Sequence, residues 1–151
     1  MPFLALIAGI LVLDQVSKLI VQMTMQENQS IPVLPGIFHL TYVRNPGAAF
    51  GFFPDRTPFF IAVTFLILFL VFLFYRRLPP EKKWQRLALG LMVGGACGNL
   101  IDRLRVGEVI DFLDFRIWPV FNVADMAITA GVILLAWEVL RSAAPAGEKK
   151  E

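Results

Sequence analysis

Aspartates interrupt an otherwise apolar chain, and two of them could form a hydrolytic pair. Asp111 lies in "GEVIDFLDF", and Asp125 lies in "FNVADMAITAG". Two carboxylates that converge share a proton, because two like charges at close range cannot both ionise. The ionised Asp can then activate a water as general base, while the protonated Asp donates to the carbonyl under attack. Such a pair hydrolyses peptides without a metal or a covalent intermediate.

Asp125 also has a purely structural explanation, which is weaker for Asp111. Asn122 is a good helix N-cap, and Asp125 then falls at the third helical position, where the helix dipole favours an acid and the two residues resemble a capping box. Asp111 shares the apolar stretch "VIDFLD" with Asp114, and periodicity does not say which of the two faces a pocket. Both explanations stay open at this stage.

Other ionisable residues also lie in apolar surroundings, where each costs about 2.5–3.5 kcal/mol at a membrane centre. Asp14 and Lys18 are four residues apart and share a helix face, so they form either a structural ion pair or a substrate contact. Asn99 and Arg103 have the same spacing. Arg103 offers a fixed fork of donors that suits a carboxylate or a phosphate.

The composition indicates a membrane protein. Hydrophobic residues make up 57% of the 151 residues and charged residues only 17%, whereas soluble domains are nearer half apolar and a quarter charged. The net charge of +2 does not indicate the basic surface that is typical of nucleic-acid-binding proteins. The single cysteine, Cys97, excludes an intrachain disulfide and fits a small packing residue. We expect no metal and no cofactor.

The hydropathy pattern predicts four transmembrane helices, because a bilayer core needs roughly 20 helical residues. An outer segment at about 28–55 alternates around residues 37–43, which suggests a short strand or two before the turn "RNPG". We expect one domain over 1–141 and a disordered cytoplasmic tail at 142–151. The expected helices cover about residues 3–22, 57–75, 85–101 and 123–141.

Basic residues in the 76–86 loop predict the orientation, because positive loops stay cytoplasmic. Both chain ends are then cytoplasmic, and the acids lie at the outer face. We expect the outer segment to rest on the membrane surface, with apolar groups at headgroup depth. Those groups are Phe50, Phe52 and Phe53.

The third expected helix carries small residues at intervals of four, a spacing that lets helix backbones approach closely. These residues are Gly90, Gly94 and Gly98.

Two other classes of protein compete with a hydrolase. A small ion or solute carrier would line a polar path with these acids, but carriers bind substrate near the midplane rather than at one face. A membrane scaffold held by the glycines gives no reason for acids at both 111 and 125.

Taken together, the polar stretches resemble the five signature motifs of bacterial lipoprotein signal peptidase, also called signal peptidase II. The resemblance covers the whole chain except the tail, in the family's order and spacing. The motifs are "LDQVSK" (13–18), "VRNPGAAFGF" (43–52), "GGACGNLIDR" (94–103), "GEVIDF" (107–112) and "FNVADMAITAG" (121–131).

The resemblance implies an aspartyl endopeptidase of the bacterial inner membrane that removes signal peptides from diacylglyceryl-modified prolipoproteins. It implies cleavage on the amino side of the lipidated cysteine, inhibition by globomycin, and a small sheet resting on the membrane. We also expect contact with membrane lipids and a monomer. The family's catalytic acids match Asp111 and Asp125. Residues around the site match Asp14, Lys18, Asn45, Gly47, Asn99, Arg103, Asn122 and Ala124.

Overall fold

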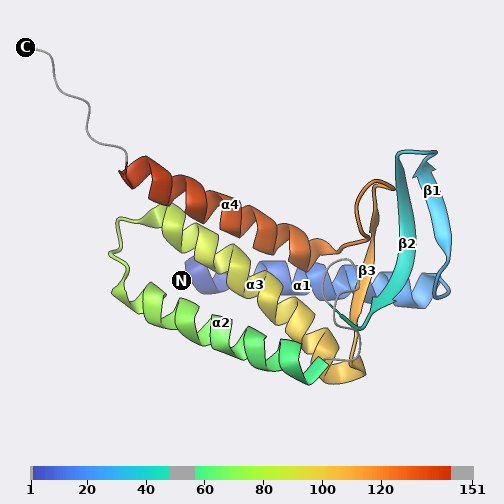
Figure 1. The fold of residues 1–151 in the computed structure, drawn as a ribbon, viewed down its shortest axis with the longest axis horizontal. Coiled ribbons are helices and arrows are strands. Elements are labelled where there is room, and N and C mark those ends of the chain that lie inside the picture. The colour runs from blue at the N-terminus through green and yellow to red at the C-terminus, as the bar shows by residue number, and fades with distance from the viewer. Residues whose placement is uncertain (1, 48–56, 144–151) are drawn as a thin grey trace, which may run out of the picture.

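The computed structural model describes residues 2–47 and 57–143, and within them the chain forms four helices and a three-stranded antiparallel sheet (Figure 1). The predicted fold class, four membrane helices with a small sheet, is confirmed. The helices are α1 (Pro2–Thr24), α2 (Thr57–Arg77), α3 (Lys83–Val106) and α4 (Val123–Ala143). The strands are β1 (Ser30–Leu34), β2 (Phe38–Asn45) and β3 (Val109–Asp114).

All four helices are long and apolar enough to cross a bilayer, with spans of 20 to 24 residues. A helix suits this environment because it satisfies its backbone hydrogen bonds internally. Helix α3 continues beyond the expected end near residue 101, and Gly107 terminates it in the left-handed region at φ 81°. Helix α2 has no fully buried residue, and many of its apolar side chains are exposed on the surface of the bundle.

Glycines let α3 pack closely against its neighbours, as the spacing predicted. A Cβ at Gly94 would lie 2.9 Å from the Cβ of Ile10 in α1. A Cβ at Gly95 would collide with the backbone carbonyl of Ala124 in α4. Because α3 has no side chain at these points, it lies between α1 and α4 and brings residues of all three helices together.

The sheet has the order β1-β2-β3 and lies at one end of the helical bundle (Figure 1). The sequence predicted strands only in the outer segment, so strand β3, which contains Asp111, was not predicted. Strand β3 is buried on both faces, so it lacks the alternation that marks a half-buried strand. Its partner β2 lies far away in the sequence, and Val43 pairs with Asp111.

The buried side of the sheet packs against the end of α1. The cluster consists of Val21, Met25, Tyr42, Ile110 and Phe112. Sheet and helix therefore share a small core next to the polar residues of the bundle.

The predicted turn "RNPG" begins later than expected, because β2 continues through Asn45 before Pro46 and Gly47 bend. Phe50, Phe52 and Phe53 and most of the predicted tail lie outside the described residues.

Candidate active site

Asp125 and Asn122 form a reciprocal cap at the start of α4. The backbone N–H of Asp125 donates to Oδ1 of Asn122 at 2.9 Å, and the backbone N–H of Asn122 donates to Oδ2 of Asp125 at 3.2 Å. The capping explanation of "NVAD" is therefore correct. It leaves Oδ1 of Asp125 available, and this oxygen accepts from Nδ2 of Asn99 at 2.8 Å.

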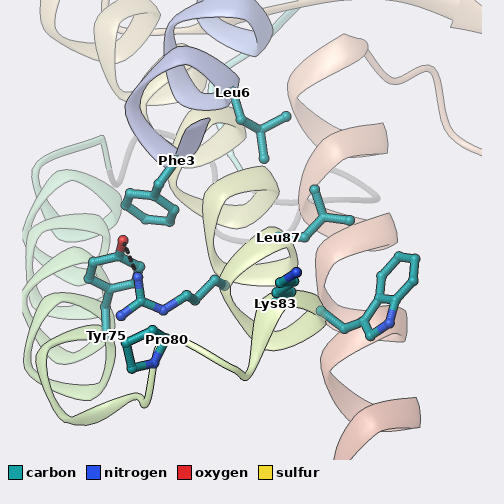
Figure 2. Close-up of a pocket in the computed structure, with 8 residues that line it drawn as sticks. Phe3, Leu6, Tyr75, Pro80, Lys83 and Leu87 are labelled. Atoms are coloured by element: carbon teal, nitrogen blue, oxygen red, sulfur yellow. Dashed lines mark hydrogen bonds between the residues drawn. The ribbon is translucent and has the colours of Figure 1, made fainter. Parts of the chain in front are cut away.

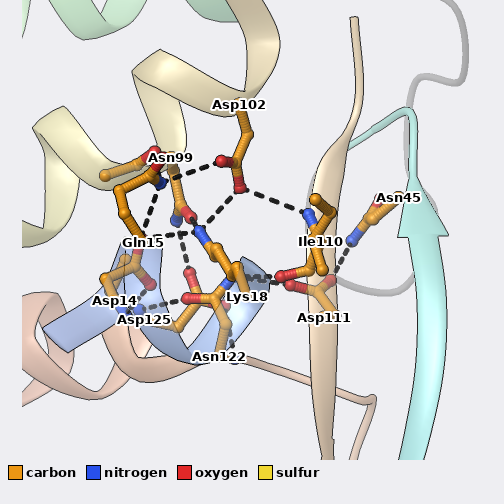
Figure 3. Close-up of polar contacts among 12 residues, drawn as sticks. Asp14, Gln15, Lys18, Asn45, Asn99, Asp102, Ile110, Asp111, Asn122 and Asp125 are labelled. Carbon is orange, nitrogen blue, oxygen red and sulfur yellow. Dashed lines mark hydrogen bonds and ion pairs between the residues drawn. The ribbon is translucent and has the colours of Figure 1, made fainter. Parts of the chain in front are cut away.

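Asp111 lies in the middle of β3 and is held by two amide side chains (Figure 3). Nδ2 of Asn122 donates to its Oδ1 at 2.6 Å, and Nδ2 of Asn45 donates to its Oδ2 at 3.0 Å. Asn45 can reach Asp111 because residues two apart on a strand share a face and Val43 is the direct partner of Asp111.

Asn122 joins the two acids. Its Oδ1 caps the helix that carries Asp125, while its Nδ2 binds Asp111. The chain reaches this position because Phe121 pairs with Leu113 in an antiparallel bridge beside β3. A strand and a helix start are thus fixed to each other by a single fully buried amide.

Both acids line one cavity of about 240 Å³, together with the side chains of Asn45, Asn99 and Arg103. One wall is the segment from Trp118 to Phe121 that connects β3 to α4. Burial raises the pKa of Asp111 to about 7, and the negative charge of Asp125 adds to the rise, while the amides of Asn45 and Asn122 oppose it. Asp111 can therefore hold a proton near neutral pH.

Lys18 lies behind the acids as a buried cation. Its Nζ is 2.9 Å from Oδ2 of Asp14, 2.7 Å from Oδ2 of Asp102 and 2.9 Å from Oδ1 of Asn99. A buried charge persists only when it is paired and hydrogen-bonded. The contact with Asn99 uses that amide's oxygen, so its nitrogen is directed to Asp125 (Figure 3).

Asp14 also supports the start of α4. Its Oδ1 accepts from the backbone N–H of Ala124 at 2.9 Å, one of the N–H groups that a helix start leaves unpaired. Ala124 is fully buried, and a Cβ at Gly98 would lie 3.3 Å from its methyl group. Small residues at both positions let α1, α3 and α4 meet at this point.

Arg103 and Gly47 form the rim of the cavity. Nη2 of Arg103 donates to the carbonyl oxygen of Gly47 at 3.4 Å, and its guanidinium lies 5.2 Å from the ring centre of Phe60. The N–H of Gly47 donates to Oδ1 of Asn45 at 3.0 Å, which orients that amide toward Asp111.

Sequence analysis missed Gln15 and Asp102. Asp102 binds Lys18, accepts from the backbone N–H of Ile110 at 3.3 Å, and accepts from Nε2 of Gln15 at 2.9 Å. It therefore links α1 and α3 to β3. Its spacing of three from Asn99 puts both residues on one helix face, a signal that could have identified it.

Asp114 lies away from this cavity, at the last residue of β3. Thr41 Oγ1 donates to its Oδ2 at 2.7 Å, and the backbone N–H of Arg116 donates to its Oδ1 at 2.8 Å. Burial alone would raise the pKa of Asp114, but these hydrogen bonds and the charge of Arg116 lower it below the usual value. Within residues 2–47 and 57–143, no group of His, Cys, Asp and Glu could hold a metal ion.

Comparison with known proteins gives consistent matches over the whole chain. The family model described as signal peptidase (SPase) II matches residues 6–141. A lipoprotein signal peptidase of Moorella thermoacetica is 55% identical over 149 residues, which is 99% of this chain and 97% of that protein. A lipoprotein signal peptidase of Pelotomaculum thermopropionicum is 50% identical over 145 residues, 96% of this chain and 95% of that protein.

Two solved structures share the fold. A bacterial membrane enzyme solved by the in meso method at 2.3 Å resolution matches with a TM-score of 0.92 and 34% identity, over 99% of this chain and 93% of that one. A second, at 1.9 Å resolution, matches with a TM-score of 0.85 and 35% identity, over 93% of each chain.

Proposed function

The chain belongs to the signal peptidase II family, and on that premise we propose that it is an aspartyl endopeptidase whose catalytic residues are Asp111 and Asp125. One observation carries the proposal. The two carboxylates come from a strand and a helix start, yet they line the same cavity within a frame of amide donors. Each acid thus keeps a fixed orientation, and no cation of the described segments forms an ion pair with either one.

The first chemical step needs one proton on the pair. The ionised carboxylate takes a proton from a water whose oxygen attacks the scissile carbonyl carbon, and the protonated carboxyl donates to the carbonyl oxygen. The product is a neutral tetrahedral diol. The raised pKa of Asp111 supports this step, because it lets the pair keep a proton near neutral pH.

The second step breaks the C–N bond. The carboxyl that gained the water proton gives it to the leaving nitrogen, while the other carboxylate takes a proton from one hydroxyl of the diol. The products are a carboxyl terminus and an amine, and the pair again holds one proton. Asn45, Asn99 and Asn122 keep the acids in place through both steps, since each donates to one of them.

The substrate we propose is a diacylglyceryl-modified prolipoprotein, cleaved on the amino side of the lipidated cysteine. The cavity lies at the end of the bundle next to the sheet, where a signal helix in the bilayer would present its carboxyl end (Figure 1). Arg103 and Gly47 at the rim offer a cationic donor and backbone groups to the substrate chain or its ester oxygens. The positioning residues that support the acids from behind are Asp14, Lys18 and Ala124.

The decisive experiment incubates purified protein with a lipidated prolipoprotein peptide and measures both products by mass spectrometry. We expect cleavage before the modified cysteine, inhibition by globomycin, and little cleavage of the unlipidated peptide. Asp125→Asn should abolish cleavage while the thermal melt persists. If a folded Asp125→Asn protein cleaves at a near-normal rate, Asp125 is a capping residue only and the mechanism is wrong.

We also propose that the chain lies in the bacterial inner membrane with the acids at the extracytoplasmic face. The support is the basic loop between α2 and α3, at the bundle end opposite the sheet (Figure 1). Single cysteines at the exposed positions Ser30 and Glu81 test this orientation in a Cys97→Ala background. An impermeant thiol reagent added from outside should label position 30 and miss position 81, and the reverse would overturn the orientation.

A further inference from the structure

A second cavity lies at the opposite end of the bundle from the acids, between the start of α1, the end of α2 and the start of α3 (Figure 2). Its volume is about 740 Å³, three times that of the acidic cavity. Pockets that hold small ligands span roughly 300–1,000 Å³. The apolar part of its lining includes Phe3, Leu6 and Leu87.

The cavity is a gap that the helices leave open toward lipid. Phe3 stacks on Tyr75 of α2 with ring centres 4.0 Å apart, which closes one side. Helix α2 buries none of its residues, so it does not fill the remaining space. An apolar space of this size favours an apolar ligand over water, and in a bilayer the available apolar ligand is an acyl chain.

A fixed guanidinium lies in the wall of this cavity. Nη1 of Arg86 donates to Oη of Tyr75 at 3.2 Å, and Nη2 donates to the carbonyl oxygen of Leu78 at 2.9 Å. Its guanidinium carbon lies 4.7 Å from the ring centre of Tyr75. A guanidinium has five N–H donors, so donors remain after these two contacts, and the buried Nε has no partner among the described residues.

Lys83 adds a second cation on the same side. It precedes Arg86 by three residues on α3, a spacing that puts both side chains on one helix face, and it also lines the cavity. In the part of the chain that the structure describes, neither residue lies within 4.0 Å of an acid. The apolar cavity therefore ends at two cationic side chains that have no counterion among residues 2–47 and 57–143.

We propose that this cavity binds a diacyl phospholipid with an anionic headgroup. One acyl chain lies among Phe3, Leu6 and Leu87, and the headgroup phosphate contacts Lys83 and Arg86. Arg86 suits this contact because its planar fork is already oriented and matches phosphate oxygens. Basic pockets between membrane helices bind anionic lipids in the same way.

Native mass spectrometry of the full chain, titrated with phosphatidylglycerol or phosphatidylcholine of identical acyl chains, tests the proposal. Phosphatidylglycerol should be retained more strongly. Lys83→Gln should weaken its retention about fivefold, the effect of one basic contact at a membrane surface. Lys82→Gln is the matched control, because Lys82 is an exposed neighbour that does not line the cavity.

Leu87→Trp tests the proposed contact with the acyl chain, because the larger side chain occupies part of the cavity. It should reduce retention of both lipids, and inorganic phosphate should not displace phosphatidylglycerol. Equal retention of the two lipids by the unmodified protein would overturn the proposal. Equal losses of phosphatidylglycerol retention in Lys82→Gln and Lys83→Gln would also overturn the proposal, since such losses indicate diffuse attraction of the lipid to the basic loop. Both lysines are exposed, so these variants should fold, and no outcome depends on peptidase activity.

Discussion

Strand β3 carries two aspartates, Asp111 in its middle and Asp114 at its last residue, and the environments of these residues differ sharply. Burial raises the pKa of Asp111 to about 7 and the charge of Asp125 adds to the rise, while the amides of Asn45 and Asn122 that hold the carboxylate oppose it. Asp114, three residues later, is held by a hydroxyl, a backbone N–H and the cation of Arg116, so its pKa is lowered. Both side chains have little accessible surface, with exposed fractions of 3% and 4%. Asp111 nevertheless lies deeper in the protein than Asp114, so desolvation contributes to the difference between their pKa values.

The contrast shows which property makes a carboxylate available for proton chemistry. The hydrogen bonds from Thr41 and from Arg116, together with the charge of Arg116, favour the ionised form of Asp114. The neutral amides around Asp111 orient the group without a full opposing charge, so protonated and ionised forms remain accessible. The cation of the acidic site, Lys18, contacts Asp14, Asp102 and Asn99 instead of the proposed catalytic pair.

Replacing each aspartate by asparagine is the most direct test of this difference between Asp111 and Asp114. Asp111→Asn should reduce kcat/KM about a thousandfold or more, because the pair then lacks one of its two proton-transfer groups. Asp114→Asn should retain substantial activity, since Asp114 lies outside the cavity and its partner Arg116 is half exposed, where ion pairs contribute about 0–1 kcal/mol. The measurement is cleavage of a lipidated prolipoprotein by variants with matched melting curves.

The double variant Asp111→Asn/Asp125→Asn tests whether the two acids work as a unit. Residues that work as a unit give non-additive losses, so the double variant should be little worse than either single one. Similar mild losses of activity in Asp111→Asn and Asp114→Asn would mean that the two aspartates of β3 do not differ in function.

Much of the helical architecture could be predicted from the sequence, because membrane spans are set by local length and composition. The capping box of Asn122 and Asp125 and the ion pair of Asp14 and Lys18 are local patterns as well, and the structure contains both. Resemblance to a family singled out Asp111 over Asp114, and their positions relative to the cavity agree with that choice.

The parts of the fold and the site that could not be predicted depend on contacts between segments far apart in the sequence. Asn45 reaches Asp111 only because β2 pairs with β3, and neither the pairing nor β3 itself has a local signature. Asp102 was missed for a related reason, since its partners Gln15 and Lys18 come from α1. Periodicity places a residue on a face of its own element, but it does not identify the element that packs against that face.

Helix packing gives a second test, because the frame of Asp111 depends on the bundle whereas the partners of Asp114 lie in the sheet and its following loop. Gly94→Leu should lower thermal stability and activity together, since even a Cβ there would lie 2.9 Å from Ile10. Overpacking typically costs about 1–3 kcal/mol. Gly9→Leu is the matched control, because a Cβ at Gly9 meets nothing within 4 Å. Equal melting temperatures for the two variants would contradict close packing of α1 on α3.

The pH dependence of kcat/KM gives the finest distinction between Asp111 and Asp114, because it reports ionisation of the free enzyme. Activity should fall as pH rises through about 7, since the proton that the pair needs then leaves Asp111. Asn45 donates to the ionised form of Asp111 and so lowers its pKa. Asn45→Ala should therefore move the alkaline decline to higher pH, by about one unit if the hydrogen bond is lost without replacement. Thr41→Val removes the corresponding donor from Asp114 and should leave the decline in place. A decline that moves with Thr41→Val, or that moves to lower pH with Asn45→Ala, would show that a group other than Asp111 controls it.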